Sequence, residues 1–225
     1  MRTLPLLLSS ALLLLACAGT ASANLVVGGT RVIYPENSKE ISVSIKNPDK
    51  NTDYLVQSRL DNDNEKNTAK VPFVITPPLF RLDHQSENVL RIARAGGKLP
   101  ADRESLYWLS VRGIAGTAGK PKENQLQVVI NQRLKYFFRP AALNNHDAAE
   151  AYQKLTFSRL GGELVMKNPT PYYVSLYTLK VGGTEIQTPG MVPPFGEHRV
   201  KTNGSGAIEW QAINDYGGHT ATAHQ

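Results

Sequence analysis

The sequence predicts an all-β protein built from two β-sandwich domains, and three observations lead to this prediction. Short runs of aliphatic, β-branched and aromatic residues recur with a two-residue alternation, which is typical of strands buried on one face. Clusters of Pro, Gly, Asn and Asp separate these runs at the spacing of a sandwich. A polar connector between Leu143 and Asp147 divides the runs into two groups, so we expect one domain over residues 24–143 and another over 147–225.

The first 23 residues are predicted to be a secretory signal peptide. Arg2 precedes the apolar run Leu4–Ala16, which is shorter than an ordinary membrane span, and the small residues Ala21–Ala23 form a cleavage site. The mature chain is then expected to begin at Asn24. A lipoprotein-type cleavage before Cys17 is the alternative interpretation, and the Ala-Ser-Ala site close behind it favours the first.

Removal of this signal changes what can hold the protein together. Cys17 is the only cysteine of the chain, so the mature protein is expected to have no disulfide and to depend on its hydrophobic cores. The formal charge is +6 for the full chain, and loss of Arg2 leaves +5, which favours anionic partners.

The first domain is predicted to consist of strands separated by turns. The last strand, from Asn124 to Arg139, has no Gly or Pro before Pro140 and is far longer than the five or six residues of an ordinary strand. The earlier strands are expected at Thr30–Tyr34, Ile41–Ile45, Tyr54–Leu60, Phe73–Thr76, Val89–Ile92 and Leu106–Gly113.

The second domain is predicted to contain two hairpins with two-residue turns, at Gly161-Gly162 and Gly182-Gly183, because glycine accepts the positive φ of such turns. Residues Ala148–Leu155 are expected to form no more than one helical turn. The predicted strands are Leu155–Leu160, Glu163–Lys167, Tyr172–Val181, Thr184–Ile186, Arg199–Lys201 and Ala207–Asn214.

The sequence carries none of the common enzymatic motifs. It has no H-x-x-x-H, no G-x-S-x-G and no phosphate-binding loop, so we expect no catalysis, no cofactor and no metal. Cations alternate with aromatic residues between Arg133 and Arg139, as in some nucleic-acid-binding sites. The predicted export signal argues against nucleic acid as a partner. Tyr136 and Phe138 are therefore interpreted as core residues. The histidines are scattered, at His84, His146, His198, His219 and His224.

Several segments together resemble the PapD-like periplasmic chaperones that assemble pili in the chaperone-usher pathway. The resemblance implies two immunoglobulin-like β-sandwich domains in an L-shaped arrangement, a cleft between them, a periplasmic location and no catalytic activity. It extends from Thr30 to Gly218. The segments that carry it are Leu126–Ile130 with Arg133–Leu143, Thr76-Pro77-Pro78 with Arg81-Leu82, Leu99–Ser105, Asn168–Val174 and Ile213–Gly218.

The resemblance also implies how a partner is bound. Leu126, Val128 and Ile130 match the side chains that such chaperones donate to a fimbrial subunit whose own sandwich lacks a strand, a mode of strand addition. Taken alone, the alternation favours the other interpretation, in which the three face their own domain's core. Arg31 and Lys135 match the two cleft cations that anchor the subunit's C-terminal carboxylate.

Three further residues match an ionic link between the two domains of the family: Glu104, Arg139 and Asp215. We expect such a link to set the angle of the cleft rather than to stabilise the fold, on the assumption that its ion pairs are exposed.

The expected partners are fimbrial subunits and an outer-membrane usher, and a second copy of the chain is the alternative occupant of the donor strand in the free protein. A rival function is an exported immunoglobulin-like structural or adhesive fimbrial component. It would require an N-terminal donor extension, and Asn24–Thr30 is too short for one. A polysaccharide-binding module is a third candidate; it would use Tyr172, Tyr173 or Trp210, which are expected to pack inside instead.

Overall fold

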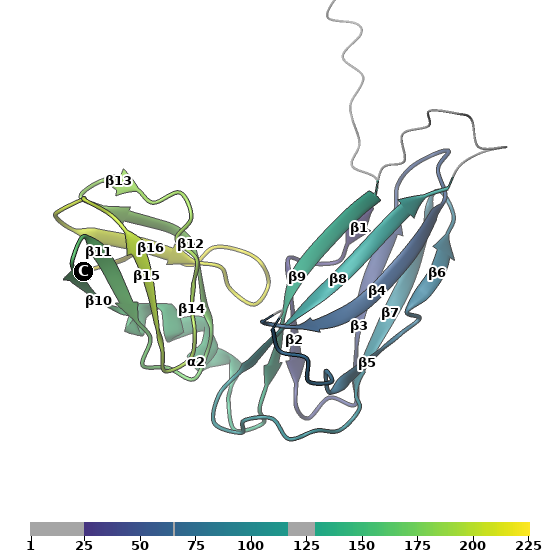
Figure 1. Cartoon of the computed structure of the whole chain (residues 1–225), viewed down its shortest axis with the longest axis horizontal. Helices are drawn as coiled ribbons and strands as arrows, with labels where there is room; N and C mark the ends of the chain where they lie inside the picture. The colour runs from purple at the N-terminus through teal and green to yellow at the C-terminus, as the bar shows by residue number, and fades with distance from the viewer. Residues whose placement is uncertain (1–24, 65, 117–128) are drawn as a thin grey trace, which may run out of the picture.

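The computed structural model describes residues 25–64, 66–116 and 129–225, which form two β-sandwich domains (Figure 1). The domains stand at an angle, and the chain has an L-shaped outline. The predicted fold class is therefore confirmed. Among these residues, no helix is both long and apolar enough to cross a membrane.

The first domain packs a four-stranded sheet, in the order β1-β3-β7-β5, against a five-stranded sheet, in the order β2-β9-β8-β4-β6. Two of these strands, β1 and β6, were not predicted. The two residues of β1 are too few to show alternation, and β6 follows Pro77-Pro78, which indicated only a turn. The bounds are β1 Val26–Val27, β2 Arg31–Pro35, β3 Glu40–Asn47, β4 Tyr54–Asn62, β5 Phe73–Thr76, β6 Leu79–Leu82, β7 Ser86–Arg94, β8 Ser105–Ala115 and β9 Val129–Arg139.

The first segment of this domain crosses from one sheet to the other. Strand β1 pairs with β3, whereas β2 pairs in parallel with β9, from Arg31 opposite Lys135 onward. Gly28 and Gly29 lie at the crossing. A Cβ on Gly28 would lie 2.7 Å from the Ser44 hydroxyl oxygen, and Gly29 has a φ of +87°, so both positions favour glycine.

Aromatic rings form the centre of the first core. Tyr34, Tyr136 and Phe138 are fully buried, and the Phe73 ring meets Tyr136 and Tyr107 edge to face, with centroids 5.0 and 5.3 Å apart. Edge-to-face contacts of this kind add to the stabilisation that comes from burial. The interpretation of Tyr136 and Phe138 as core residues is therefore confirmed.

Replacing Tyr136 with Phe is expected to raise the free energy of unfolding by about 1 kcal/mol. The Tyr136 hydroxyl is buried and has no hydrogen-bond partner among the described residues, so its removal relieves a desolvation cost. Tyr34→Phe is the matched control, because the Tyr34 hydroxyl donates to the Ser38 carbonyl at 2.9 Å and accepts from the Arg94 amide at 3.2 Å. Urea denaturation should show a gain in the free energy of unfolding for Tyr136→Phe and a loss for Tyr34→Phe. Equal losses would contradict the absence of a hydrogen-bond partner for the Tyr136 hydroxyl.

The second domain has a three-stranded sheet, β10-β11-β15, and a larger sheet in which β12 lies between β13 or β14 on one side and β16-β17 on the other. Both predicted glycine hairpin turns are present, with φ between +56° and +82° at all four glycines. The bounds are β10 Thr156–Leu160, β11 Glu163–Lys167, β12 Val174–Val181, β13 Thr184–Glu185, β14 Met191–Val192, β15 Glu197–Lys201, β16 Ile208–Ala212 and β17 Ala223–His224.

A helical segment longer than predicted leads into this domain. It consists of α2 (Asn145–Glu150) and the 3₁₀ helix η1 (Ala151–Lys154), and the expectation of a single turn over 148–155 was wrong. The side chain of Asn144 caps it by accepting a hydrogen bond from the Asp147 amide at 2.8 Å. The Trp210 ring is buried in the core of the second domain, against which this helical segment packs. Its indole N–H donates to the Tyr152 carbonyl at 2.9 Å, so Trp210 is not available at the surface.

Candidate functional site

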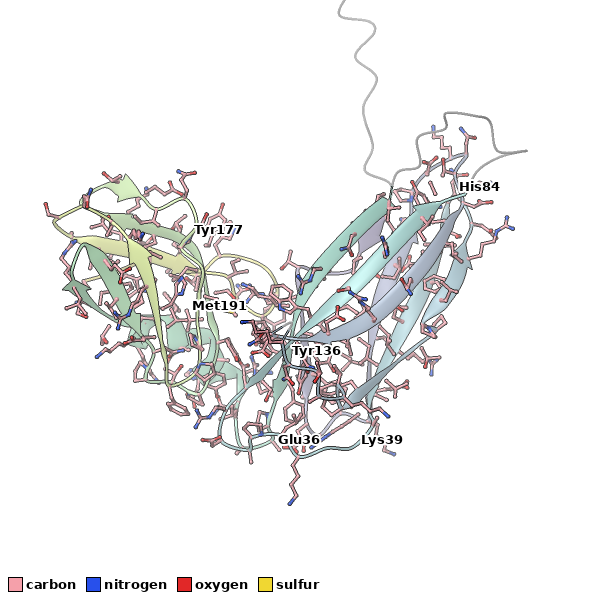
Figure 2. All side chains as sticks on the ribbon, in the orientation of Figure 1. Glu36, Lys39, His84, Tyr136, Tyr177 and Met191 are labelled. Atoms are coloured by element: carbon pink, nitrogen blue, oxygen red, sulfur yellow. The ribbon has the colours of Figure 1, made fainter. Side chains whose placement is uncertain are left out.

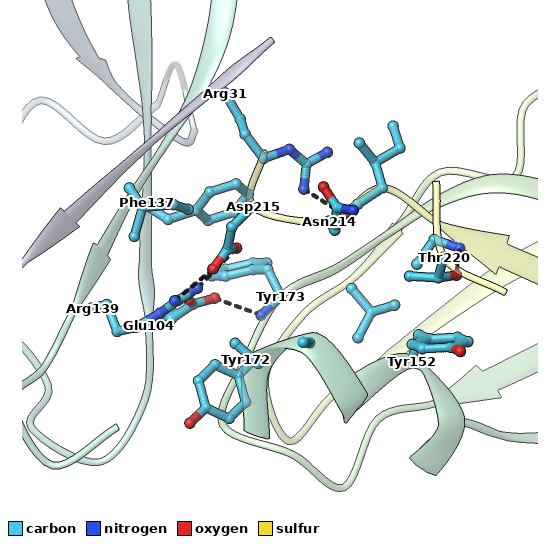
Figure 3. Close-up of a pocket in the computed structure, with 16 residues that line it drawn as sticks. Arg31, Glu104, Phe137, Arg139, Tyr152, Tyr172, Tyr173, Asn214, Asp215 and Thr220 are labelled. Carbon is cyan, nitrogen blue, oxygen red and sulfur yellow. Dashed lines mark hydrogen bonds and ion pairs between the residues drawn. The ribbon is translucent and has the colours of Figure 1, made fainter. Parts of the chain in front are cut away.

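Two cations from neighbouring strands meet where the domains face each other. Arg31 on β2 is the register partner of Lys135 on β9, which places both side chains on the outer face of the five-stranded sheet. Both then reach the second domain. Lys135 Nζ donates to the Ser175 hydroxyl at 3.0 Å. Arg31 Nη1 donates to the Ile213 carbonyl at 2.9 Å (Figure 3).

The electrostatics of this pair indicate a site that lacks negative charge. Burial, and then repulsion from Arg31, lower the pKa of Lys135 to about 8. Burial also lowers the pKa of Arg31, although Asp215 and Glu104 partly oppose this change. Arg31 Nε is buried and has no acceptor among the described residues. An incoming carboxylate would supply both the missing charge and the missing acceptor.

The edge of β9 is open just before these cations. Strand β8 pairs with β9 from Val129 to Phe138, but on the other side β2 pairs only from Lys135 onward. On that side residues 129–134 therefore have no paired strand among the described residues, although the Gln132 side chain donates to the Leu25 carbonyl at 2.6 Å. Such an edge is a template for an added strand. A strand lying in line with β2 would end beside Arg31 and Lys135.

The predicted donor side chains are only partly within the described structure. Leu126 and Val128 lie outside the described residues. Ile130 is half-buried and shares the inner face of β9 with Leu134 and Tyr136, where it packs against the core of its own domain. In the free protein Ile130 therefore faces the core of its own domain, as the alternation alone indicated. Only the solvent-exposed part of its side chain can contact a partner.

The structure brings Glu104, Arg139 and Asp215 together at the domain junction (Figure 3). Arg139 lies 2.7 Å from a carboxylate oxygen of Glu104 and 2.7 Å from one of Asp215. The other oxygen of Glu104 accepts from the Tyr173 amide at 2.8 Å. Because Glu104 and Arg139 belong to the first domain while Tyr173 and Asp215 belong to the second, the contacts join the two.

This network is buried, and the assumption that its ion pairs are exposed was wrong. The side chains of Arg139, Glu104 and Asp215 are 4%, 2% and 27% exposed. Although burial works against it, the hydrogen bonds with Asp215 and the charge of Glu104 raise the pKa of Arg139. Burial raises the pKa of Glu104, and the Arg139 charge opposes that rise. Each charge thus depends on its partner for compensation.

Sequence reasoning missed several residues at the junction. Ser175 binds Lys135, the Tyr173 ring lies 5.5 Å from that of Phe137, and Asn145 accepts from Arg139 at 2.7 Å. Tyr173 lies in a segment that carried the resemblance, and Ser175 follows it by two residues, on the same face of an extended chain. That alternation was the available signal for Ser175.

Comparisons with known proteins cover most of the chain. Residues 24–144 match the profile "Pili and flagellar-assembly chaperone, PapD N-terminal domain", and residues 150–224 match "Pili assembly chaperone PapD, C-terminal domain". The chain is 41% identical to the chaperone protein FimC of Escherichia coli O6:H1 over 209 residues, which cover 90% of this chain and 84% of FimC. It is 42% identical to the Escherichia coli chaperone protein FocC over 203 residues, 88% of either chain.

Solved structures show the same similarity. A chain in the complex of the Salmonella enterica SafA pilin with the SafB chaperone superimposes with a TM-score of 0.80 and 34% identity, covering 92% of this chain and 98% of that one. The crystal structure of the Escherichia coli chaperone DraB superimposes with a TM-score of 0.78 and 37% identity. The match covers 89% of this chain and 97% of the DraB chain.

Proposed function

The chain belongs to the PapD-like family of pilus-assembly chaperones, and we propose that it captures exported fimbrial subunits in the periplasm and delivers them to an outer-membrane usher. It acts by binding alone, without catalysis or a cofactor. The observation that supports this most directly is the open edge of β9, which ends at the half-buried cations Arg31 and Lys135. FimC and FocC are named as chaperones, and SafB was solved with a pilin.

In this mechanism an incomplete subunit adds a strand to residues 129–134 and places its terminal carboxylate between Arg31 and Lys135. Leu126, Val128 and the uncovered part of Ile130 fill the groove left by the subunit's missing strand. The carboxylate fixes the register, and register matters because a slip of one residue would turn the donated side chains away. The capture covers both an open sheet edge and an apolar groove, which are the two features that make a subunit aggregate.

The buried network of Glu104, Arg139 and Asp215 is proposed to hold the angle between the domains, so that Ser175 stays within reach of Lys135. Arg139 is the last residue of β9 and is followed directly by the interdomain connector. The same strand therefore carries the open edge, the anchor and the link.

Val128→Ala is expected to weaken subunit binding about tenfold, because two buried carbons are lost from the donated side chain. Gln127→Ala is the matched control: neighbouring residues of an added strand face opposite sides, so this substitution should change binding by less than twofold. The measurement is titration of the exported, tagged protein with a purified subunit from its fimbrial gene cluster. Equal effects of both substitutions would refute donation by this strand, and no complex with wild type would refute the proposed function.

Subunit binding is expected to weaken as the pH rises above about 8. The pKa of Lys135 is about 8 in the free protein, and a bound carboxylate raises it. The bound state therefore holds more protons, so affinity is constant below pH 8 and falls by up to tenfold per pH unit between the two pKa values. Lys135→Arg should flatten this profile because arginine keeps its charge. A profile that falls equally in the variant would contradict the assignment to Lys135.

A further inference from the structure

The outer face of the five-stranded sheet carries more positive charge than the carboxylate anchor requires. Strand register places Arg112 on β8 beside Asn131 on β9, and places Ser110 on β8 between Arg59 on β4 and Arg133 on β9. All three arginines are exposed and project from the same face as Lys135. They line hollows on this face, one of about 500 Å³ that includes Arg59 and Arg133.

Among the described residues, one of the three arginines has a carboxylate partner. Arg59 Nε lies 3.1 Å from Asp61, which also accepts from the Ser110 hydroxyl. Among the described residues, neither Arg112 nor Arg133 is within ion-pair distance of a carboxylate. The Arg133 guanidinium instead lies 4.8 Å from the centroid of the Trp108 ring, a cation–π contact that holds it in place.

This charge lies next to the open edge. Arg133 is on β9 within residues 129–134, two residues before Lys135 on the same face. A strand added to that edge runs about 4.8 Å from β9 and turns alternate side chains to the outer face. Its outward residue beside Arg133 is then a cross-strand neighbour, and opposite charges at such positions attract.

We infer that Arg133, with Arg112 as its diagonal neighbour on β8, selects partner strands that carry acidic side chains on their outward face within a few residues of the C-terminal carboxylate. The inference rests on the proposed function and names the chemistry of the strand that this site prefers. The partner's apolar side chains face the other way, so the two kinds of recognition do not compete. The preference for acidic side chains is electrostatic, and it acts at positions of the partner strand that Arg31 and Lys135 do not contact.

Synthetic twelve-residue peptides with a free C-terminal carboxylate test the inference. They carry Val at every second position, Thr at the intervening ones, and Glu or Lys at the two intervening positions nearest the carboxylate. Wild type should bind the Glu peptide about tenfold more tightly than the Lys peptide in 50 mM NaCl. The preference should shrink in 500 mM NaCl because the charges are exposed.

The Arg112→Gln/Arg133→Gln variant should reduce the preference to about twofold or less. Arg91→Gln is the matched control, because Arg91 is an exposed arginine on the outer face of the other sheet, and it should keep the full preference. A full preference in the double variant, or equal binding of both peptides by wild type, would overturn the inference and leave the proposed function intact. If blocking the carboxylate as an amide changes nothing, or if neither free peptide binds, the anchor itself is refuted and the inference falls with it.

Discussion

Arg139→Met is expected to lower the free energy of unfolding by about 3 to 5 kcal/mol. The substitution keeps most of the volume but leaves Glu104, whose side chain is 2% exposed, without its compensating cation. The Tyr173 amide alone remains to bind that carboxylate. Denaturation monitored by circular dichroism measures the loss, and small-angle scattering should show a wider range of interdomain distances.

Two companion variants separate the causes of that loss. Asp215→Asn should cost only about 1 kcal/mol, because Asp215 is 27% exposed and water screens part of its interaction. Adding Glu104→Gln to Arg139→Met should recover part of the stability, since the uncompensated charge is gone. A loss below 1 kcal/mol for Arg139→Met would show that the network contributes little, as an exposed link would.

Lys135→Ala is expected to weaken subunit capture by at least about thirtyfold while the protein stays folded. Removal of one partner from a half-buried, charge-assisted contact costs about 2 to 5 kcal/mol in binding, and here it also leaves the subunit carboxylate with Arg31 alone. Arg31→Ala should have a similar effect on capture. Lys39→Ala is the control, because Lys39 is exposed, and Figure 2 shows it at the end of the first domain, away from the second domain. Pull-down of a subunit from cells that express the pilus operon, with mass spectrometry of the bound proteins, measures the effect.

The same substitution should not destabilise the free protein through its charge. The folded-state pKa of Lys135, about 8, lies below the usual value of 10.5, so the buried charge opposes folding fully below pH 8 and less as the pH rises toward 10.5. Lys135→Met, which keeps the aliphatic stem, should raise the free energy of unfolding at pH 7 by about 1 kcal/mol after allowance for partial exposure. Undiminished capture by a folded Lys135→Ala protein would refute the anchor.

Local features of the fold followed from the sequence because they depend on neighbouring residues. The glycine pairs at 161–162 and 182–183 determine their hairpin turns through backbone freedom, and alternation identified most strands. The parallel pairing of β2 with β9 joins residues about one hundred positions apart, and no local pattern encodes it. The helix at Asn145–Lys154 was underestimated because its stability comes from packing on the second core rather than from its own periodicity.

For the candidate site too, some features could be predicted from the sequence and others could not. The residue types of Arg31, Lys135, Glu104, Arg139 and Asp215 were recognised by resemblance, and the structure places all five at the domain junction. Their burial was not predictable, because it depends on how closely the second domain approaches the first. The sequence did not decide whether Ile130 faces its own core or a partner, for a related reason. Alternation along a strand shows which residues share a face, but not what covers that face.

The crossing of the first segment at Gly28-Gly29 has a mechanical consequence. Side-chain packing joins the two sheets across the core, and near this edge a short covalent path also runs from β1 in one layer to β2 in the other. A load applied where β2 meets β9, for example when a bound strand is pulled away, is therefore shared by both layers. The edge proposed to hold the subunit strand is thus reinforced against separation from its own domain.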